Sequence, residues 1–158
     1  MRTILAALAG LAILAAPAAS ALTVETRMSV DFQKKLDKDY GVREANTLTA
    51  ALTSKIENQF ARQGVTADRV VVTIEDAKPN RPTFQQVSDK PGLDPIRSIS
   101  IGGAHLVGIA YDASGKEIGT LDYDWYETDL SNVIAATTWS DARWTFDRFA
   151  RRFADKLS

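Results

Sequence analysis

Residues 22–32 read LTVETRMSVDF, and this stretch decides which class of fold the chain can adopt. Apolar residues or threonine occupy every second position from Leu22 to Phe32, and polar or charged residues fill the positions between them. Side chains on a β-strand point alternately to opposite faces, so a period of two predicts a strand with one buried and one wet face. We therefore expect a sheet that is packed on one side only.

Downstream the apolar period changes from two to between three and four. From Val42 to Gln63 this spacing places the apolar residues on one side of a helix. Gly64 follows where a left-handed residue would end that helix. The period of two then returns in three further stretches, 69–76, 98–112 and 117–127. The last two are joined by Asp112–Lys116, in which Gly115 indicates a hairpin turn.

A second amphipathic helix is expected from about Thr138, where Thr138 and Asp141 resemble a capping box. Its apolar stripe consists of Trp139, Ala142, Phe146, Phe149, Phe153 and Leu157. The order strand, helix, strand, strand, strand, helix predicts an α+β fold. We expect a two-layer sandwich, in which a four-stranded, largely antiparallel sheet carries both helices on one face.

Two segments are predicted to be irregular. Residues 33–39 alternate in charge and suggest a solvated connection. Residues 77–97, AKPNRPTFQQVSDKPGLDPIR, hold four of the five prolines of the chain. Proline cannot donate a ladder hydrogen bond, and a loop of this length in a compact domain is more often functional than a plain connector. We expect Phe84 to pin this loop to the body of the fold.

The first 21 residues have the pattern of a secretory leader. A short cationic start precedes an apolar run, and Ala19-Ser20-Ala21 provides small residues for cleavage. We expect cleavage after Ala21 and one α+β domain over residues 22–158, with no later membrane span. The chain has no cysteine for a disulfide or a lipid. This predicts a periplasmic protein, with onward secretion as the alternative.

The chain resembles small exported Gram-negative bacterial proteins of unknown function. The features that carry this resemblance are the leader, the period-two strands, the closing aromatic helix and one segment with the residues Asp31, Phe32, Tyr40, Gly41, Arg43 and Glu44. The layout is also similar to envelope lipoprotein and transport-auxiliary domains, although this chain lacks the lipoprotein cysteine. The resemblance implies the fold and the compartment, and it supplies no catalytic residues.

Composition limits the possible partners and cofactors. A net charge of −1 argues against a nucleic-acid partner, which needs a basic face. With no cysteine and one histidine, a standard structural zinc site cannot be built, and no cofactor is expected. His105 lies among isoleucine and valine residues and is expected to be a core residue with a satisfied ring nitrogen.

Residues 122–129, DYDWYETD, form the most conspicuous polar cluster. Alternation predicts that Tyr123 and Trp125 face the helices and that Asp122, Asp124 and Tyr126 face solvent. Two carboxylates two positions apart on a strand lie about 7 Å apart, which suits glycoside hydrolysis. Asp122 and Asp124 therefore support one alternative, a small hydrolase acting on envelope glycans. A second alternative adds Glu127 and Asp129 as cation or small-ligand contacts.

The last helix offers a candidate contact surface on its polar side. Trp144 lies opposite the Phe146 stripe, and Arg148 follows four residues later, so the two could stack. Tryptophan and arginine are enriched at binding hot spots. We favour binding over catalysis: an envelope-associated interaction module with an envelope protein as partner, using this surface and the Pro-rich loop. The sequence leaves the oligomeric state open.

Overall fold

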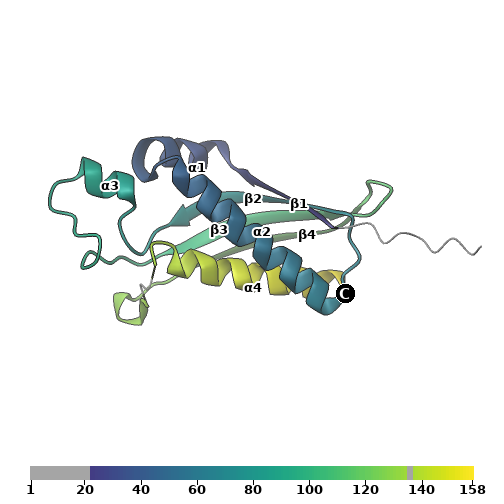
Figure 1. Cartoon of the computed structure of the whole chain (residues 1–158). Helices are drawn as coiled ribbons and strands as arrows, with labels where there is room; N and C mark the ends of the chain where they lie inside the picture. The colour runs from purple at the N-terminus through teal and green to yellow at the C-terminus, as the bar shows by residue number, and fades with distance from the viewer. Residues whose placement is uncertain (1–21, 135–136) are drawn as a thin grey trace, which may run out of the picture.

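A computed structural model describes residues 22–134 and 137–158 of the chain. Four strands form one sheet in the spatial order β1-β2-β3-β4, with β1 and β2 parallel and the other neighbours antiparallel. Helices α2 and α4 lie side by side on one face of the sheet (Figure 1). The elements are β1 (Thr23–Met28), α2 (Arg43–Gln63), β2 (Arg69–Lys78), β3 (Gly103–Tyr111), β4 (Glu117–Tyr126) and α4 (Ser140–Leu157). The predicted two-layer α+β fold is confirmed.

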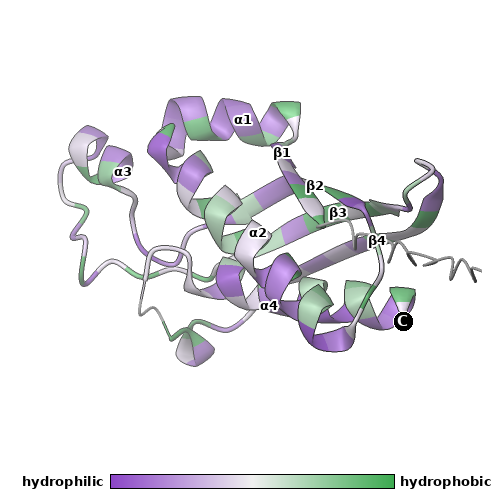
Figure 2. Ribbon diagram, turned by 45° about the vertical axis from the view of Figure 1, so that its right-hand side comes forward, coloured by the Kyte–Doolittle hydropathy of each residue, from purple (hydrophilic) through white to green (hydrophobic). Residues whose placement is uncertain are grey.

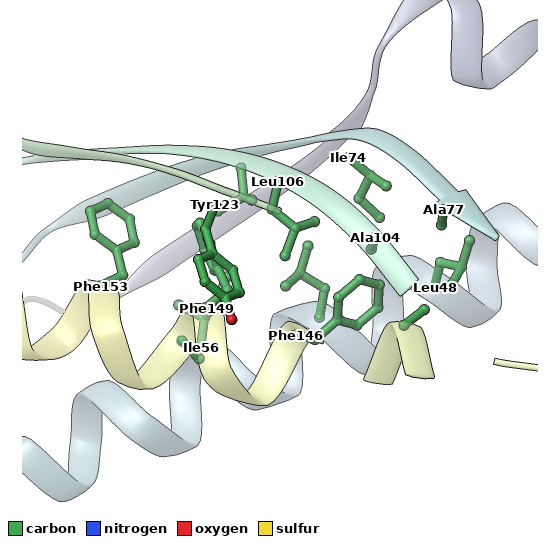
Figure 3. Close-up of a cluster of buried hydrophobic side chains, with 14 of the residues drawn as sticks. Leu48, Ile56, Ile74, Ala77, Ala104, Leu106, Tyr123, Phe146, Phe149 and Phe153 are labelled. Atoms are coloured by element: carbon green, nitrogen blue, oxygen red, sulfur yellow. The ribbon is translucent and has the colours of Figure 1, made fainter. Parts of the chain in front are cut away.

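The core lies between the sheet and the two helices (Figure 3). Apolar and polar residues alternate along α2 and α4 (Figure 2), and the apolar ones are buried against the strands. Phe146, Phe149 and Phe153 of α4 point toward the sheet, on whose inner face Leu106 of β3 and Tyr123 of β4 lie (Figure 3). The predicted α2 and its terminal Gly64, with φ of 65°, are also confirmed.

The inward face of β3 corrects the prediction for His105. Ala104, Leu106 and Ala110 are fully buried under the helices, and Gly108 lies between them. His105 has the opposite parity, so its side chain lies on the other face of the sheet and is 35% exposed. It is therefore not a core residue, although its ring nitrogen does have a partner in Asp122.

The first strand ends earlier than its alternation predicts. Ser29 follows β1 and caps a short helix α1 (Val30–Lys35), since its hydroxyl oxygen accepts the Phe32 N–H at 3.2 Å. A π-helical segment, η1 (Leu36–Tyr40), follows α1 directly. Phe32 and Leu36 are fully buried. The expected strand to Phe32 and the expected solvated connection over 33–39 are both wrong, because four-residue spacing buries these two side chains on a helix.

The Pro-rich segment between β2 and β3 is mostly irregular, as predicted, but it contains one helical turn. A capping box between Thr83 and Gln86 begins α3 (Phe84–Asp89). Phe84 is 82% exposed, so it does not pin the loop. Residues 98–102, expected to belong to the third strand, lead into β3 without joining it.

The two adjacent glycines Gly102 and Gly103 predict a close approach of backbone segments, and the structure shows one at each. Gly103 has φ of 150°, and a Cβ at this position would lie 2.3 Å from the Trp125 carbonyl oxygen. The backbones of β3 and β4 therefore meet where only glycine fits.

Substituting Gly103 by alanine tests this approach. We expect Gly103→Ala to lower the free energy of unfolding by about 3 kcal/mol, because a clash with backbone adds to conformational strain. Gly92→Ala is the matched control: φ is 98° there, but nothing lies within 4 Å, so only the strain of about 1 kcal/mol applies. Urea unfolding measures both, and equal losses would contradict the close approach.

Candidate functional site

The acidic strand β4 is arranged as its alternation predicts. Tyr123 and Trp125 face the helices, where Arg152 and Arg148 each place the guanidinium carbon 4.7 Å from the ring centre of Tyr123 and Trp125 respectively. Asp122 and Asp124 are exposed on the other face. Arg148 thus packs against the sheet, so the expected stack on Trp144 is replaced by one on Trp125.

Asp122 pairs with His105 across the open face, with 2.7 Å between a carboxylate oxygen and Nε2. The Asp122 side chain is 71% exposed. A glycosidase general acid depends on burial or a neighbouring charge to raise its pKa. Asp122 and Asp124 are both exposed, so neither carboxyl has the burial that a general acid of the hydrolase alternative requires.

Tyr126, the third predicted polar residue of the strand, is half-buried and belongs to a separate group. Its hydroxyl donates to a carboxylate oxygen of Asp76 at 3.5 Å, and Lys35 pairs with the other oxygen at 2.8 Å. Burial, with the nearby Asp76 and Asp124 charges, raises the pKa of Tyr126 well above its usual range. Tyr126 therefore remains a neutral donor that supports the Lys35–Asp76 pair.

Glu127 and Asp129 shape the loop that follows β4. Glu127 accepts the N–H groups of Thr128 at 2.8 Å and Asp129 at 3.0 Å, and Asp129 accepts that of Ser131 at 2.8 Å. These bonds lower the pKa of both carboxyls. Across the parts of the chain that the structure describes, no cluster of three or more His, Cys, Asp or Glu side chains could hold a metal ion.

Trp144 lies on the outward side of α4 and is 57% exposed. It borders a hollow with Lys55 and Asp147, which form an ion pair of 2.9 Å. Arg148, turned to Trp125, is not part of this hollow. Trp144 and Arg148, predicted to form one contact surface, therefore contact different parts of the protein. Of the two, Trp144 is the one with a large exposed apolar side chain.

A cavity of about 290 Å³ lies between the Pro-rich segment and η1, and we call it the loop pocket. Its residues come from the end of β2 and the four residues after it (78–82), from α3, from residues 90–100 and from Tyr40. Lys78, Arg81 and Lys90 line it, and among the residues that the structure describes no Asp or Glu does. Leu93 and Ile99 add apolar lining. The pocket is thus cationic in a chain of slightly negative net charge.

Asn80 and Asp141 hold the loop pocket to the body of the protein. Asn80 is fully buried; its amide nitrogen donates to the Asp141 carboxylate at 2.5 Å, and its amide oxygen accepts the Asp141 N–H at 2.7 Å. The same carboxylate oxygen accepts the Gly102 N–H at 3.0 Å. We call this set the Asn80–Asp141 brace. It turns the Asp141 side chain away from Thr138, so the predicted capping box is not formed.

The electrostatics of the loop pocket favour a negative ligand. Burial raises the pKa of Tyr40, so this lining residue adds no negative charge to the pocket. Within residues 22–134 and 137–158, neither Lys78 nor Lys90 has a carboxylate within ion-pair distance. Gln86 is already engaged, because its side chain accepts the Thr83 N–H at 3.1 Å.

The sequence pattern predicts the Pro-rich segment as a candidate surface but does not by itself single out the residues that make it a pocket. Lys78, Arg81 and Lys90 fall within thirteen positions among the prolines, and this clustering is the signal that the sequence contains. Tyr40 could not be found in this way, because it reaches the pocket from a turn expected to be solvated.

Comparisons with known proteins give little further information. No family model matches the chain, and no curated protein matches it. One solved structure, a minor lipoprotein from Acinetobacter baumannii, is loosely similar in layout, with 12% identity over 87% of this chain and 92% of that one and a TM-score of 0.35. A similarity at this level carries no argument about fold or function. Within the described residues, no helix is long and apolar enough to cross a membrane.

Removing the Asn80 side chain tests the brace. We expect Asn80→Ala to lower the free energy of unfolding by about 2–3 kcal/mol, because it leaves the buried Asp141 N–H and carboxylate short of partners. Asn58→Ala is the control, since Asn58 is exposed and its side-chain amide donates to the backbone and side chain of Ser54, one helical turn earlier, at 2.6 Å and 3.1 Å. Urea unfolding followed by circular dichroism compares them, and a loss no larger than that of the control would show that the brace does not stabilise the fold.

Proposed function

We propose that this chain is an exported, non-catalytic binding module of the bacterial envelope, and that its loop pocket binds an anionic group. The observation that carries the proposal is a cavity lined by Lys78, Arg81 and Lys90 and by no acidic residue. Hydrogen bonds between cationic side chains and phosphate or carboxylate oxygens are among the stronger ones in proteins, at about 1.5–3 kcal/mol each.

The size of the loop pocket limits the ligand. Sites for small molecules usually enclose about 300–1,000 Å³, and this cavity of about 290 Å³ lies at the lower end. It suits a phosphate or carboxylate with a short attached group, and Leu93 and Ile99 provide the apolar contact for that group. Because the Asn80–Asp141 brace fixes the loop before any ligand arrives, binding would require little ordering of the chain.

The proposed compartment rests on the pattern of the sequence. The leader-like residues 1–21 lie outside the described residues, so export to the periplasm remains a proposal supported by their pattern. The absence of cysteine from the whole chain agrees with a fold that needs no disulfide in an oxidising compartment. Trp144 remains a proposed contact for an envelope protein partner because of its exposure on α4.

Neutralising the pocket lysines tests the proposal. We expect inorganic phosphate, titrated into ¹⁵N-labelled protein, to shift the amide signals of residues 78–90, and Lys78→Gln with Lys90→Gln to weaken this binding at least tenfold. Arg62→Gln, in the last turn of α2, with Lys116→Gln, in the β3–β4 turn, removes the same charge outside the loop pocket and should leave the affinity within twofold. An equal loss in both double variants, or phosphate shifts outside the loop pocket, would contradict the proposal.

A further inference from the structure

We propose that the end of the molecule that carries the loop pocket docks on an anionic lipid surface. The pocket would take a lipid phosphate, and the exposed apolar side chains around it would enter the interface. We call this end the loop end; it is made of residues 36–44, which hold η1 and the start of α2, and residues 77–100, which hold α3. The inference rests on the proposed anion site and names the source of the anion.

Exposed apolar side chains gather at the loop end. Of the nine most exposed large hydrophobic residues in the described ranges, four belong to it: Val42 at 63%, Phe84 at 82%, Ile96 at 70% and Ile99 at 45% exposure. Scattered single residues of this kind need no explanation, but a concentration in neighbouring segments does. Val42 and Phe84 also line one common hollow beside Tyr40.

The shape of the loop end suits a flat surface better than a partner's side chain. In Figure 1, α3 and the chain around it project from the sheet at the end opposite the β3–β4 hairpin. Phe84 occupies the first position of α3, and Ile96 lies in the turn that Asp94 closes by accepting the Ile96 N–H at 2.7 Å and the Arg97 N–H at 2.8 Å. Both side chains are thus presented outward by ordered backbone.

Charge complements this apolar set. Residues 77–100 contain four cations, Lys78, Arg81, Lys90 and Arg97, and two carboxylates, Asp89 and Asp94. Residues 36–44 contain two cations and three carboxylates, so the whole loop end has a surplus of one positive charge in a chain of net charge −1, and three of its cations line the loop pocket. Four of the five carboxylates serve local contacts: Asp94 closes its turn, Asp89 accepts from the Gln85 side chain at 2.6 Å, Asp37 accepts from the Gln33 side chain at 2.8 Å, and Glu44 accepts from the Trp139 indole N–H at 2.6 Å. Basic residues beside exposed aromatic and aliphatic ones are the combination by which peripheral segments bind anionic bilayers.

Vesicle binding by the purified protein tests the inference. We expect cosedimentation with vesicles of phosphatidylglycerol and phosphatidylcholine in equal parts to be at least tenfold tighter than with phosphatidylcholine alone. Phe84→Ser with Ile96→Ser should weaken vesicle binding at least tenfold and leave phosphate binding in solution unchanged. Val30→Ser with Ile118→Ser, which removes two exposed apolar side chains elsewhere, is the control and should bind as the parent does.

The outcomes separate this inference from the proposed function. Binding of phosphate in solution without binding of anionic vesicles would overturn the lipid inference and leave the anion site intact. Equal binding to both kinds of vesicle, or a parent-like Phe84→Ser and Ile96→Ser variant, would also overturn it. Loss of vesicle binding in Lys78→Gln with Lys90→Gln, together with loss of phosphate binding, would support both.

Discussion

The hydrogen bonds between Asn80 and Asp141 are the constraint on which the rest of this structure depends. They join the end of β2 to the first turn of α4, residues 61 apart in the sequence, and bring in the start of β3 through the Gly102 N–H. A buried carboxylate is costly unless its oxygens are satisfied. Here one donor, the Asn80 amide, comes from the Pro-rich segment and the other, the Gly102 N–H, from just after it, so the cost of burying Asp141 is offset only when that segment adopts its folded path.

The brace explains how a Pro-rich segment can form a pocket. The Asn80 N–H donates to the Thr138 carbonyl at 2.7 Å, and the Asn80 carbonyl accepts the Ser100 N–H at 2.8 Å, so both ends of the segment are fixed close together. Between these points α3 and residues 90–100 project from the body of the fold and present Lys90, while Lys78 lies just before them at the end of β2. The acidic residues of β4, in contrast, pair on an open sheet face or cap a loop, and their geometry is that of structural support.

The periodicity of the sequence predicts the two layers well, because helix and strand spacing follow directly from which side chains are buried. The prediction from periodicity fails at Ser29, because the Ser29 hydroxyl caps helix α1 although the alternation of apolar and polar residues continues to Phe32. It also misplaces His105, since both sets of alternating residues in β3 contain apolar side chains. The set with the smaller side chains, which includes Ala104, Gly108 and Ala110, faces the helices, because the rings of Phe149 and Phe153 fill the space above Gly108, where a Cβ would lie 2.6 Å from Phe149. Which face of β3 is buried therefore depends on α4, which lies about forty residues further along the chain.

The central claim is that the brace holds the loop pocket in a fixed arrangement. Amide hydrogen exchange of Gly102 and Asp141 tests it most directly, because each N–H donates to the partner that the brace requires. If the claim is right, both amides exchange only with global unfolding, as slowly as the central amides of β3. Exchange of these two amides as fast as that of the β3–β4 hairpin turn, while the β3 amides stay protected, would contradict it.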